Sequence, residues 1–199
     1  KFMKKLLVVS AVALFASMSA QETSNEGFAK GSTFVTGAVG FNSVKTGNVK
    51  ENNFTISPSV GYFVTSNIAL GARIGYNNLT KDNGTRKATV DTFTAGVFGR
   101  YYWMPASKFS VFAELGADYA NSSYDSGVAG SQKSKANGFG VEFAPGISYF
   151  LSNNFALESK VGVLGYNSVK PDATGAESTD SFNFGLNLND IKLGLVYKF

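Results

Sequence analysis

Eight stretches of this sequence alternate between apolar and other residues with a period of two, and this pattern constrains the fold more than any other feature. Such alternation predicts β-strands, because successive side chains of a strand point to opposite faces of the sheet. In the stretch 67–77 one parity is apolar throughout, with Ile68, Leu70, Ala72, Ile74 and Tyr76. The other stretches cover about 33–42, 53–64, 89–103, 109–120, 138–150, 155–166 and 181–199. In 155–166 the apolar parity carries Leu157, Val161 and Val163.

The connections between these stretches alternate in length. The short ones are predicted to be tight turns and cover 65–66, 104–108 and 151–154. The longer ones are polar, rich in Gly, Asn, Ser and Lys, and are predicted to be loops over 43–52, 78–88, 121–137 and 167–180. Strands joined alternately by turns and loops predict an up-and-down antiparallel sheet, with the turns at one end and the loops at the other.

The two faces of the predicted sheet differ in size and polarity. One parity is large and apolar with almost no charge, whereas the other is small and polar, with many Gly, Ser and Thr residues. The charges on the small face balance, and they are Arg73, Arg100, Lys160, Lys192, Glu114, Asp118, Glu142 and Glu158. A balanced set on a Gly-rich face predicts ion pairs inside a narrow lumen. We expect these pairs to be structural, because buried charges need partners; a gated proton or ion path is the alternative.

The apolar face is predicted to meet lipid. Only helices and closed barrels satisfy all their backbone groups in a bilayer, and spanning strands of about 9–11 residues carry aromatic girdles at both interfaces. Near the short turns the predicted girdle contains Tyr62, Tyr101, Trp103 and Tyr149, and a second aromatic band lies near the loops. We therefore predict an all-β protein, an eight-stranded antiparallel up-and-down transmembrane β-barrel over residues 33–199. A soluble secreted β protein, which would stay in solution without detergent, is the alternative.

Residues 1–20 are predicted to be a signal peptide. The segment begins with a basic stretch that contains Lys1, Lys4 and Lys5. The run 6–16 that follows is apolar, and small residues precede Gln21, as in a signal peptide. Cleavage is expected after Ala20 or, alternatively, after Ser19. Residues 21–32 are expected to be a short periplasmic segment ahead of the barrel. Without the three lysines of the leader, 15 basic residues face 14 acidic ones, and no basic patch that would indicate nucleic-acid binding remains.

The last stretch alternates up to the terminal Phe199. At this point the chain resembles the small eight-stranded outer-membrane β-barrels, a family that includes the transmembrane domain of outer-membrane protein A, the X-type barrels and the opacity-like proteins. The resemblance covers about Thr33–Phe199. Its most specific part is similar to the signal read by the barrel-assembly machinery and consists of Leu193, Leu195, Tyr197 and Phe199.

This resemblance implies a location and a set of partners. It implies a protein of the bacterial outer membrane with both mature termini in the periplasm. Its partners would be outer-membrane lipid and lipopolysaccharide, with the barrel-assembly machinery and periplasmic chaperones during biogenesis. A surface ligand cannot be named from the sequence.

Two features depart from the regular pattern. The parity of Phe182, Phe184, Leu186 and Leu188 is opposite to that of the residues after Ile191. A β-bulge at Asn189–Asp190 would restore the phase, and a turn there is the alternative. Pro58 and Pro145 lie inside predicted strands, where proline removes a ladder hydrogen bond, so we expect local bulges or strand ends.

Composition limits the chemistry. The chain has no Cys and no His, which excludes thiol nucleophiles, Ser-His-Asp triads and His-ligated zinc. The enzymes among barrels of this shape use a catalytic His, and the spacing of Asp172, Glu177 and Asp180 matches no Ca²⁺ loop. We therefore expect no cofactor and no catalysis. The predicted function is a structural or surface-interaction role through four extracellular loops; the alternative is a narrow porin for small solutes or ions.

Overall fold

The computed structural model describes residues 26–186 and 191–199. The predicted signal peptide, residues 1–20, therefore lies outside the described residues, as do residues 21–25 of the predicted periplasmic segment. The predicted bulge or turn at Asn189–Asp190 also lies outside them. Within the described ranges, no helix is long and apolar enough to cross a membrane.

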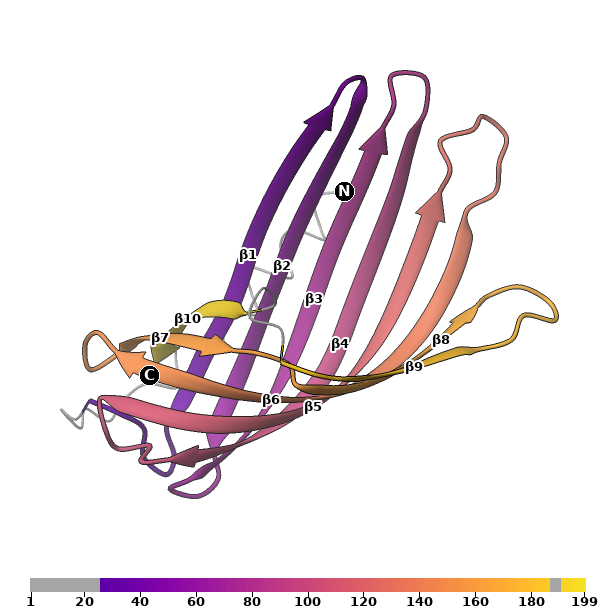
Figure 1. Cartoon of the computed structure of the whole chain (residues 1–199). Helices are drawn as coiled ribbons and strands as arrows, with labels where there is room; N and C mark the ends of the chain where they lie inside the picture. The colour runs from indigo at the N-terminus through magenta and orange to yellow at the C-terminus, as the bar shows by residue number, and fades with distance from the viewer. Residues whose placement is uncertain (1–25, 187–190) are drawn as a thin grey trace.

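Ten strand segments form one antiparallel sheet that closes into a barrel (Figure 1). They are β1 (Thr33–Thr46), β2 (Val49–Phe63), β3 (Ile68–Asp82), β4 (Lys87–Trp103), β5 (Phe109–Asp125), β6 (Ser134–Phe150), β7 (Phe155–Lys160), β8 (Leu164–Pro171), β9 (Thr179–Phe184) and β10 (Lys192–Lys198). Each of β1 to β5 pairs with the next strand along the chain. The ring continues from β6 to β7, from β7 to β10, and from β10 back to β1. β8 pairs with the far part of β6, and β9 pairs with β8. The ring thus has eight strand positions, and the predicted eight-stranded antiparallel barrel is confirmed.

The strands extend further at the long-connection end than the sequence predicted. β1 and β2 remain paired as far as Thr46 and Val49, so residues 43–52 form a tight hairpin and the predicted loop there is wrong. The same correction applies to the other three connections, which narrow to 83–86, 126–133 and 172–178. Polar side chains do not end a ladder, because the backbone hydrogen bonds of paired strands need no apolar face. The four predicted loops are therefore mostly β-hairpins that prolong the strands of the barrel, and we call them the raised hairpins.

The two prolines act differently on the ladder. Pro58 leaves a gap between the pairs Ile56–Tyr76 and Ser59–Arg73 without changing the register of β2 against β3. Beside Pro145, three steps along β6 match four steps from Lys160 to Leu164, so β7 and β8 are separated by a one-residue bulge. The predicted run through Val161 and Val163 is therefore wrong: these residues lie in the break, and the exposed parity resumes at Leu164.

The lumen is aromatic at the short-turn end. Phe34, Phe63, Tyr102, Phe112 and Phe150 point inward from five strands and are fully buried. This aromatic layer corrects the prediction that the inner face is small and polar throughout. Glycines on neighbouring strands make room for the rings: a Cβ on Gly61 would overlap the ring of Phe34, and a Cβ on Gly146 would overlap that of Phe112. Large rings opposite glycines let a narrow barrel pack its interior without voids.

The two ends of the chain close the ring over a short distance only. β1 and β10 pair from Phe34–Lys198 to Gly37–Leu195. Beyond Gly37, β1 keeps β2 on one side and, among the described residues, has no strand partner on the other. Figure 1 shows the far part of β1 standing apart from the β8–β9 hairpin. We call this separation, between β1 beyond Gly37 and the β8–β9 hairpin, the seam.

Candidate functional site

An ion cluster crosses the lumen above the aromatic layer, and Arg100 is its most buried cation. Its side chain is only 2% exposed. The guanidinium donates from Nε to Glu114 Oε2 at 2.6 Å and from Nη1 to Glu158 Oε2 at 2.8 Å. Nη1 also donates to the Tyr102 hydroxyl at 3.1 Å. The guanidinium carbon lies 4.6 Å from the centroid of the Phe112 ring, so Arg100 joins the ion cluster to the aromatic layer.

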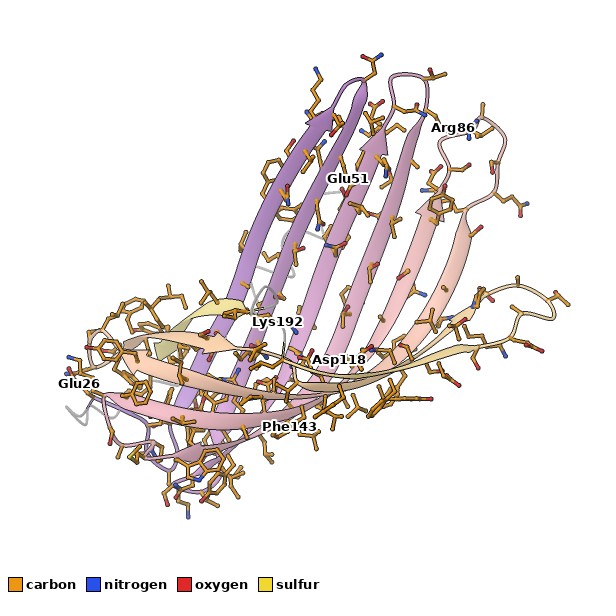
Figure 2. All side chains as sticks on the ribbon, in the orientation of Figure 1. Glu26, Glu51, Arg86, Asp118, Phe143 and Lys192 are labelled. Carbon is orange, nitrogen blue, oxygen red and sulfur yellow. The ribbon has the colours of Figure 1, made fainter. Side chains whose placement is uncertain are left out.

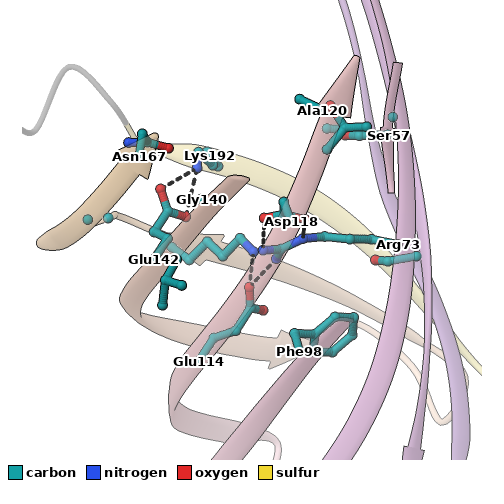
Figure 3. A pocket seen from close by; sticks show the side chains of 18 of the residues that line it. Ser57, Arg73, Phe98, Glu114, Asp118, Ala120, Gly140, Glu142, Asn167 and Lys192 are labelled. Carbon is teal, nitrogen blue, oxygen red and sulfur yellow. Dashed lines mark hydrogen bonds and ion pairs between the residues drawn. The ribbon is translucent and has the colours of Figure 1, made fainter. Parts of the chain in front are cut away.

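Glu114 is the centre of the cluster (Figure 3). Besides Arg100, it accepts hydrogen bonds at Oε1 from Arg73 Nη1 at 2.7 Å and from Lys160 Nζ at 2.6 Å. Arg73 also donates from Nε to Asp118 Oδ1 at 2.7 Å. Residues of β3, β4, β5 and β7 therefore meet at one carboxylate. Such multiple pairing is what a carboxylate needs when it is 98% shielded from water.

A separate pair lies nearby. Lys192 Nζ donates to Glu142 Oε1 and Oε2 at 2.9 and 3.0 Å. Both side chains are more open than the cluster, with Lys192 54% and Glu142 34% exposed. The structure thus brings six of the eight predicted luminal ions into one connected cluster and places the other two in a pair beside it. All eight line the same cavity.

Glycines make the cluster possible. A Cβ on Gly116 would overlap the Arg73 guanidinium, and a Cβ on Gly96 would overlap the Asp118 carboxylate. These positions lie on strands that flank the crossing side chains. Even a methyl group would force the ions apart, so small residues on the luminal face are a packing requirement.

A chamber of about 1360 Å³ lies above the cluster. Its walls carry hydroxyls and amides, and these polar side chains include Thr55, Ser57, Asn77, Thr94 and Asn167. Among the described residues, no three His, Cys, Asp or Glu side chains are grouped so that they would hold a metal ion. The hydroxyls lack a histidine base, because the chain contains none. The walls also carry apolar side chains, among them Ile74, Val141 and Val163, so the chamber is of mixed polarity.

The predicted girdle residues lie on the outer face at the short-turn end. Tyr62, Tyr101, Trp103 and Tyr149 are all exposed, and the rings of Tyr101 and Trp103 pack edge to face at 5.0 Å. The predicted assembly signal runs along β10, with Leu193, Leu195 and Tyr197 exposed.

The C-terminal residue lies against both its own strand and the first one. Its backbone N donates to the carbonyl of Thr33 at 2.9 Å, and the Phe199 ring packs edge to face on Tyr197 at 4.8 Å. The residues of the predicted assembly signal are therefore part of the strand that closes the ring.

Phe28 forms a plug at the short-turn mouth that was not predicted from the sequence. Phe28 enters the aromatic layer and lies 4.8 Å from the Phe63 ring centroid and 4.9 Å from that of Phe150. Its backbone N donates to Pro105 O, and Lys198 Nζ donates to Gly27 O, both at 2.7 Å. A single aromatic residue in the otherwise polar segment 21–32 was the available signal. The aromatic layer could have been predicted from aromatic residues of the luminal parity, which stand beside the girdle residues in the sequence.

Comparisons with known proteins agree with this architecture. The profile of the outer membrane protein beta-barrel domain matches residues 8–199. No curated protein matches the chain. The solved structure of the outer membrane protein OprG from Pseudomonas aeruginosa has 16% identity and a TM-score of 0.54, covering 88% of this chain and 99% of OprG. Neisserial surface protein A, from Neisseria, has 16% identity and a TM-score of 0.50, covering 85% of this chain and 100% of its own.

At such identities the two solved structures show the fold alone, whereas the profile covers nearly the whole chain. The resemblance read from the strand pattern and the terminal Phe199 is confirmed. The predicted location is confirmed as well, since the exposed apolar wall and the matched domain are those of a barrel in the bacterial outer membrane. The chain belongs to the family of the outer membrane protein beta-barrel domain.

Proposed function

We propose that this protein is a non-enzymatic, non-conducting barrel with a structural or surface-interaction role in the outer membrane. The observation that supports the proposal is the double filling of its lumen. Six paired ions and, below them, a layer of buried aromatic rings occupy the cross-section between the chamber and the short-turn mouth. An eight-stranded barrel has an interior that side chains fill, so both levels leave little space for a solute.

The lack of catalysis is supported by the state of the carboxylates. A general acid or base must be available for proton transfer with a substrate. Glu114 accepts from three cations, and Glu158 accepts from Arg100 and from the Thr36 hydroxyl at 3.3 Å. Both carboxylates are engaged in pairing, which favours a structural role over acid–base chemistry.

The raised hairpins are the proposed contact surface. Their basic residues outnumber the acidic ones by eight to six: Lys45, Lys50, Lys81, Arg86, Lys87, Lys133, Lys135 and Lys170 against Glu51, Asp82, Asp125, Asp172, Glu177 and Asp180. Some of these charges pair across a hairpin or between hairpins, as Lys81 does with Glu51 at 3.4 Å. We propose that the remaining positive charge pairs with anionic phosphates of lipopolysaccharide.

Biogenesis requires partners of its own. We propose that periplasmic chaperones carry the unfolded chain and that the barrel-assembly machinery reads β10 and Phe199. The proposal is supported by the position of this strand, whose outward residues Leu193, Leu195 and Tyr197 alternate toward the C-terminus. The same strand completes the ring by pairing with β1.

A solute-release assay tests the non-conducting role. Vesicles loaded with a small sugar and carrying the refolded chain should release it no faster than protein-free vesicles. A narrow porin is the second candidate, and the wide chamber above the cluster favours it. Release that rises with the amount of folded barrel would support the porin and overturn the structural proposal.

A further inference from the structure

The outer face of the first two raised hairpins carries a row of basic residues. Lys45 pairs with Lys50 in the ladder between β1 and β2. Lys50 in turn pairs with Asp82 of β3, which pairs with Lys87 of β4. The two hairpins lie side by side in Figure 1, and these residues share the parity of the exposed lipid-facing wall, so their side chains point to the outer face. We call Lys45, Lys50 and Lys87 the lysine row.

The lysine row has no anionic partner in the part of the chain that the structure describes. None of its three members forms an ion pair with a described carboxylate. The carboxylate of Asp82 belongs to its own turn, where Oδ1 accepts the N–H of Gly84 at 2.8 Å. Like charges directly opposite one another destabilise a ladder, so Lys45 and Lys50 repel each other. An anion from outside the chain would relieve this repulsion.

The two ladders hold the lysines at a fixed spacing. Pairing continues to Thr46–Val49 in the first hairpin and to Asp82–Lys87 in the second. Directly opposite Cβ atoms lie about 4.5–5.5 Å apart, so neighbouring ammonium groups can approach one anion. Cations that are held in place before binding lose little conformational freedom when the anion arrives.

A row of hydroxyls and amides lies directly below the lysine row on the same face. Its members pair in order across the four strands, and we call it the polar row: Ser43, Asn52, Thr80 and Thr89. The Ser43 hydroxyl donates to the Asn52 amide oxygen at 2.7 Å. Hydroxyls and amides both donate and accept hydrogen bonds, so this row is complementary to the hydroxyls of a sugar.

Apolar residues begin below the polar row. Phe41 and Phe54 face each other across the ladder between β1 and β2, and both are exposed. On the neighbouring strands, the Tyr76 hydroxyl donates to Asp91 Oδ1 at 2.6 Å, as expected for a girdle tyrosine whose hydroxyl reaches the polar level. The lysines of β1 and β2 are four residues beyond the two phenylalanines, which is about 13 Å along a strand. A sugar fits within this distance.

The order of the three levels indicates the occupant. Acyl chains pack on the apolar level, sugar hydroxyls bind the polar row, and phosphates form charge-assisted hydrogen bonds with the lysine row. A phospholipid carries its phosphate next to its acyl chains, whereas a phosphorylated glycolipid has a sugar between them. The separation of the lysines from the aromatic rings therefore favours the glycolipid.

We propose that the lysine row binds the phosphates of one phosphorylated glycolipid of the outer leaflet. Its sugars lie on the polar row, and its acyl chains lie on Phe41 and Phe54. The inference rests on the proposed pairing of the raised hairpins with lipopolysaccharide and assigns that pairing to one face of two hairpins. The connection 167–180 carries one basic and three acidic residues, so the fourth hairpin offers phosphate no comparable site.

Retention of lipid by the folded barrel tests the proposal. The chain is refolded in micelles of a nonionic detergent and mixed with lipid A, with lipid A freed of its phosphates, or with phosphatidylglycerol. Native mass spectrometry gives the fraction of barrel that carries each lipid. We expect lipid A to be retained at least fivefold more than either of the other two lipids.

Two variants that lose the same number of charges provide the comparison. The test variant replaces the lysine row and carries Lys45→Gln, Lys50→Gln and Lys87→Gln. The control variant removes three charges elsewhere and carries Lys30→Gln, Lys81→Gln and Lys133→Gln. In the control, Lys81 already pairs with Glu51 at 3.4 Å, and Lys30 belongs to the segment at the short-turn mouth.

The test variant should lose at least four-fifths of the retained lipid A, and the control variant should keep it. Heat-modifiable migration on gels shows that each variant is folded. If the triple test variant does not fold, the double variant with Lys45→Gln and Lys50→Gln takes its place, because these two lysines face each other in the ladder.

Three results would overturn the proposal. Equal loss of lipid A from both variants would leave a general pairing with phosphates in place and remove its assignment to the lysine row. Full retention by the test variant would place the glycolipid elsewhere on the barrel. Equal retention of phosphatidylglycerol and lipid A would show a phosphate site without a sugar. The non-conducting role is tested separately by solute release, so its failure is distinguishable from all three.

Discussion

At the scale of single residues, the pairing of Glu114 with three cations determines how the lumen is stabilised. A buried carboxylate is costly unless it is paired and hydrogen-bonded. Arg73, Arg100 and Lys160 each approach it within 2.7 Å. Arg100 is the least replaceable of the three, because it also holds Glu158 and contacts the aromatic layer.

Replacing Arg100 should therefore destabilise the barrel strongly. Arg100→Met leaves Glu158 without its cation and Glu114 with two instead of three, and breaking a buried pair from one side costs about 3–5 kcal/mol. The free energy of unfolding by urea, measured in phospholipid vesicles, gives the loss. Lys81→Met is the control, because Lys81 is 64% exposed and its pair with Glu51 is solvated. Equal stability of the two variants would contradict this view of the cluster.

Phe28 provides a second prediction at this scale. Its ring lies among four buried aromatic rings although it belongs to the segment that precedes the barrel. Truncation of such a ring to alanine usually costs about 3–5 kcal/mol. Phe28→Ala should lower the unfolding free energy by that amount, whereas Lys30→Ala, at an exposed position, should not. An unchanged Phe28→Ala variant would show that the segment does not plug the mouth.

The positions of some functional residues could be predicted from the sequence, whereas their contacts could not. The luminal ions were predictable because they share a parity on strands with strong alternation, and residues of one parity face one side of a sheet. Which carboxylate each cation contacts depended on register, which alternation alone does not give. Phe28 was not predictable as a plug, because its position follows from how the chain turns back into the barrel mouth at Gly27, where φ is +102°.

At the scale of elements, the short ladder between β1 and β10 is the closure of the barrel. In the part of the chain that the structure describes, four residue pairs join the two strands, and the Phe199 N–H bond to Thr33 adds one contact beyond them. The terminal residue therefore contributes a large share of a small interface.

Deleting Phe199 should block assembly. The deletion removes the contact with Thr33 and the ring that packs on Tyr197, at the strand that completes the ring. We expect a strong drop in heat-modifiable barrel recovered from outer membranes, measured by gel migration against an internal standard. Removal of the exposed side chain in Lys30→Ala serves as the control. Normal membrane levels of the deletion variant would refute the assembly-signal hypothesis.

The elements were predicted in kind but not in extent. Existence, orientation and number of strands followed from the alternation, while their ends did not. Residues 43–52 were polar enough to suggest a loop, yet Lys45 pairs with Lys50 in a continuous ladder. The bulge between Lys160 and Leu164 was hidden because the residue that induces it, Pro145, is on the neighbouring strand.

At the scale of the whole molecule, the barrel has three levels. The aromatic layer with Phe28 closes the short-turn mouth, the ion cluster lies above it, and the chamber occupies the half nearer the hairpins. In Figure 2 the luminal Asp118 lies between Glu26 at the short-turn end and Arg86 at the hairpins. The sequence indicated the polar lumen and the lipid-facing wall. It did not indicate the seam, because alternation shows which way side chains point and not which strand edges pair.

The central claim is that these levels seal the lumen, and single-channel recording in planar lipid bilayers tests it most directly. The wild-type chain, refolded and inserted, should show no stable conductance steps, because paired ions and buried rings leave no continuous water path. Stable steps whose size changes when Arg73 or Glu114 is neutralised, by Arg73→Met or Glu114→Gln, would contradict the account and identify the cluster as part of an ion path.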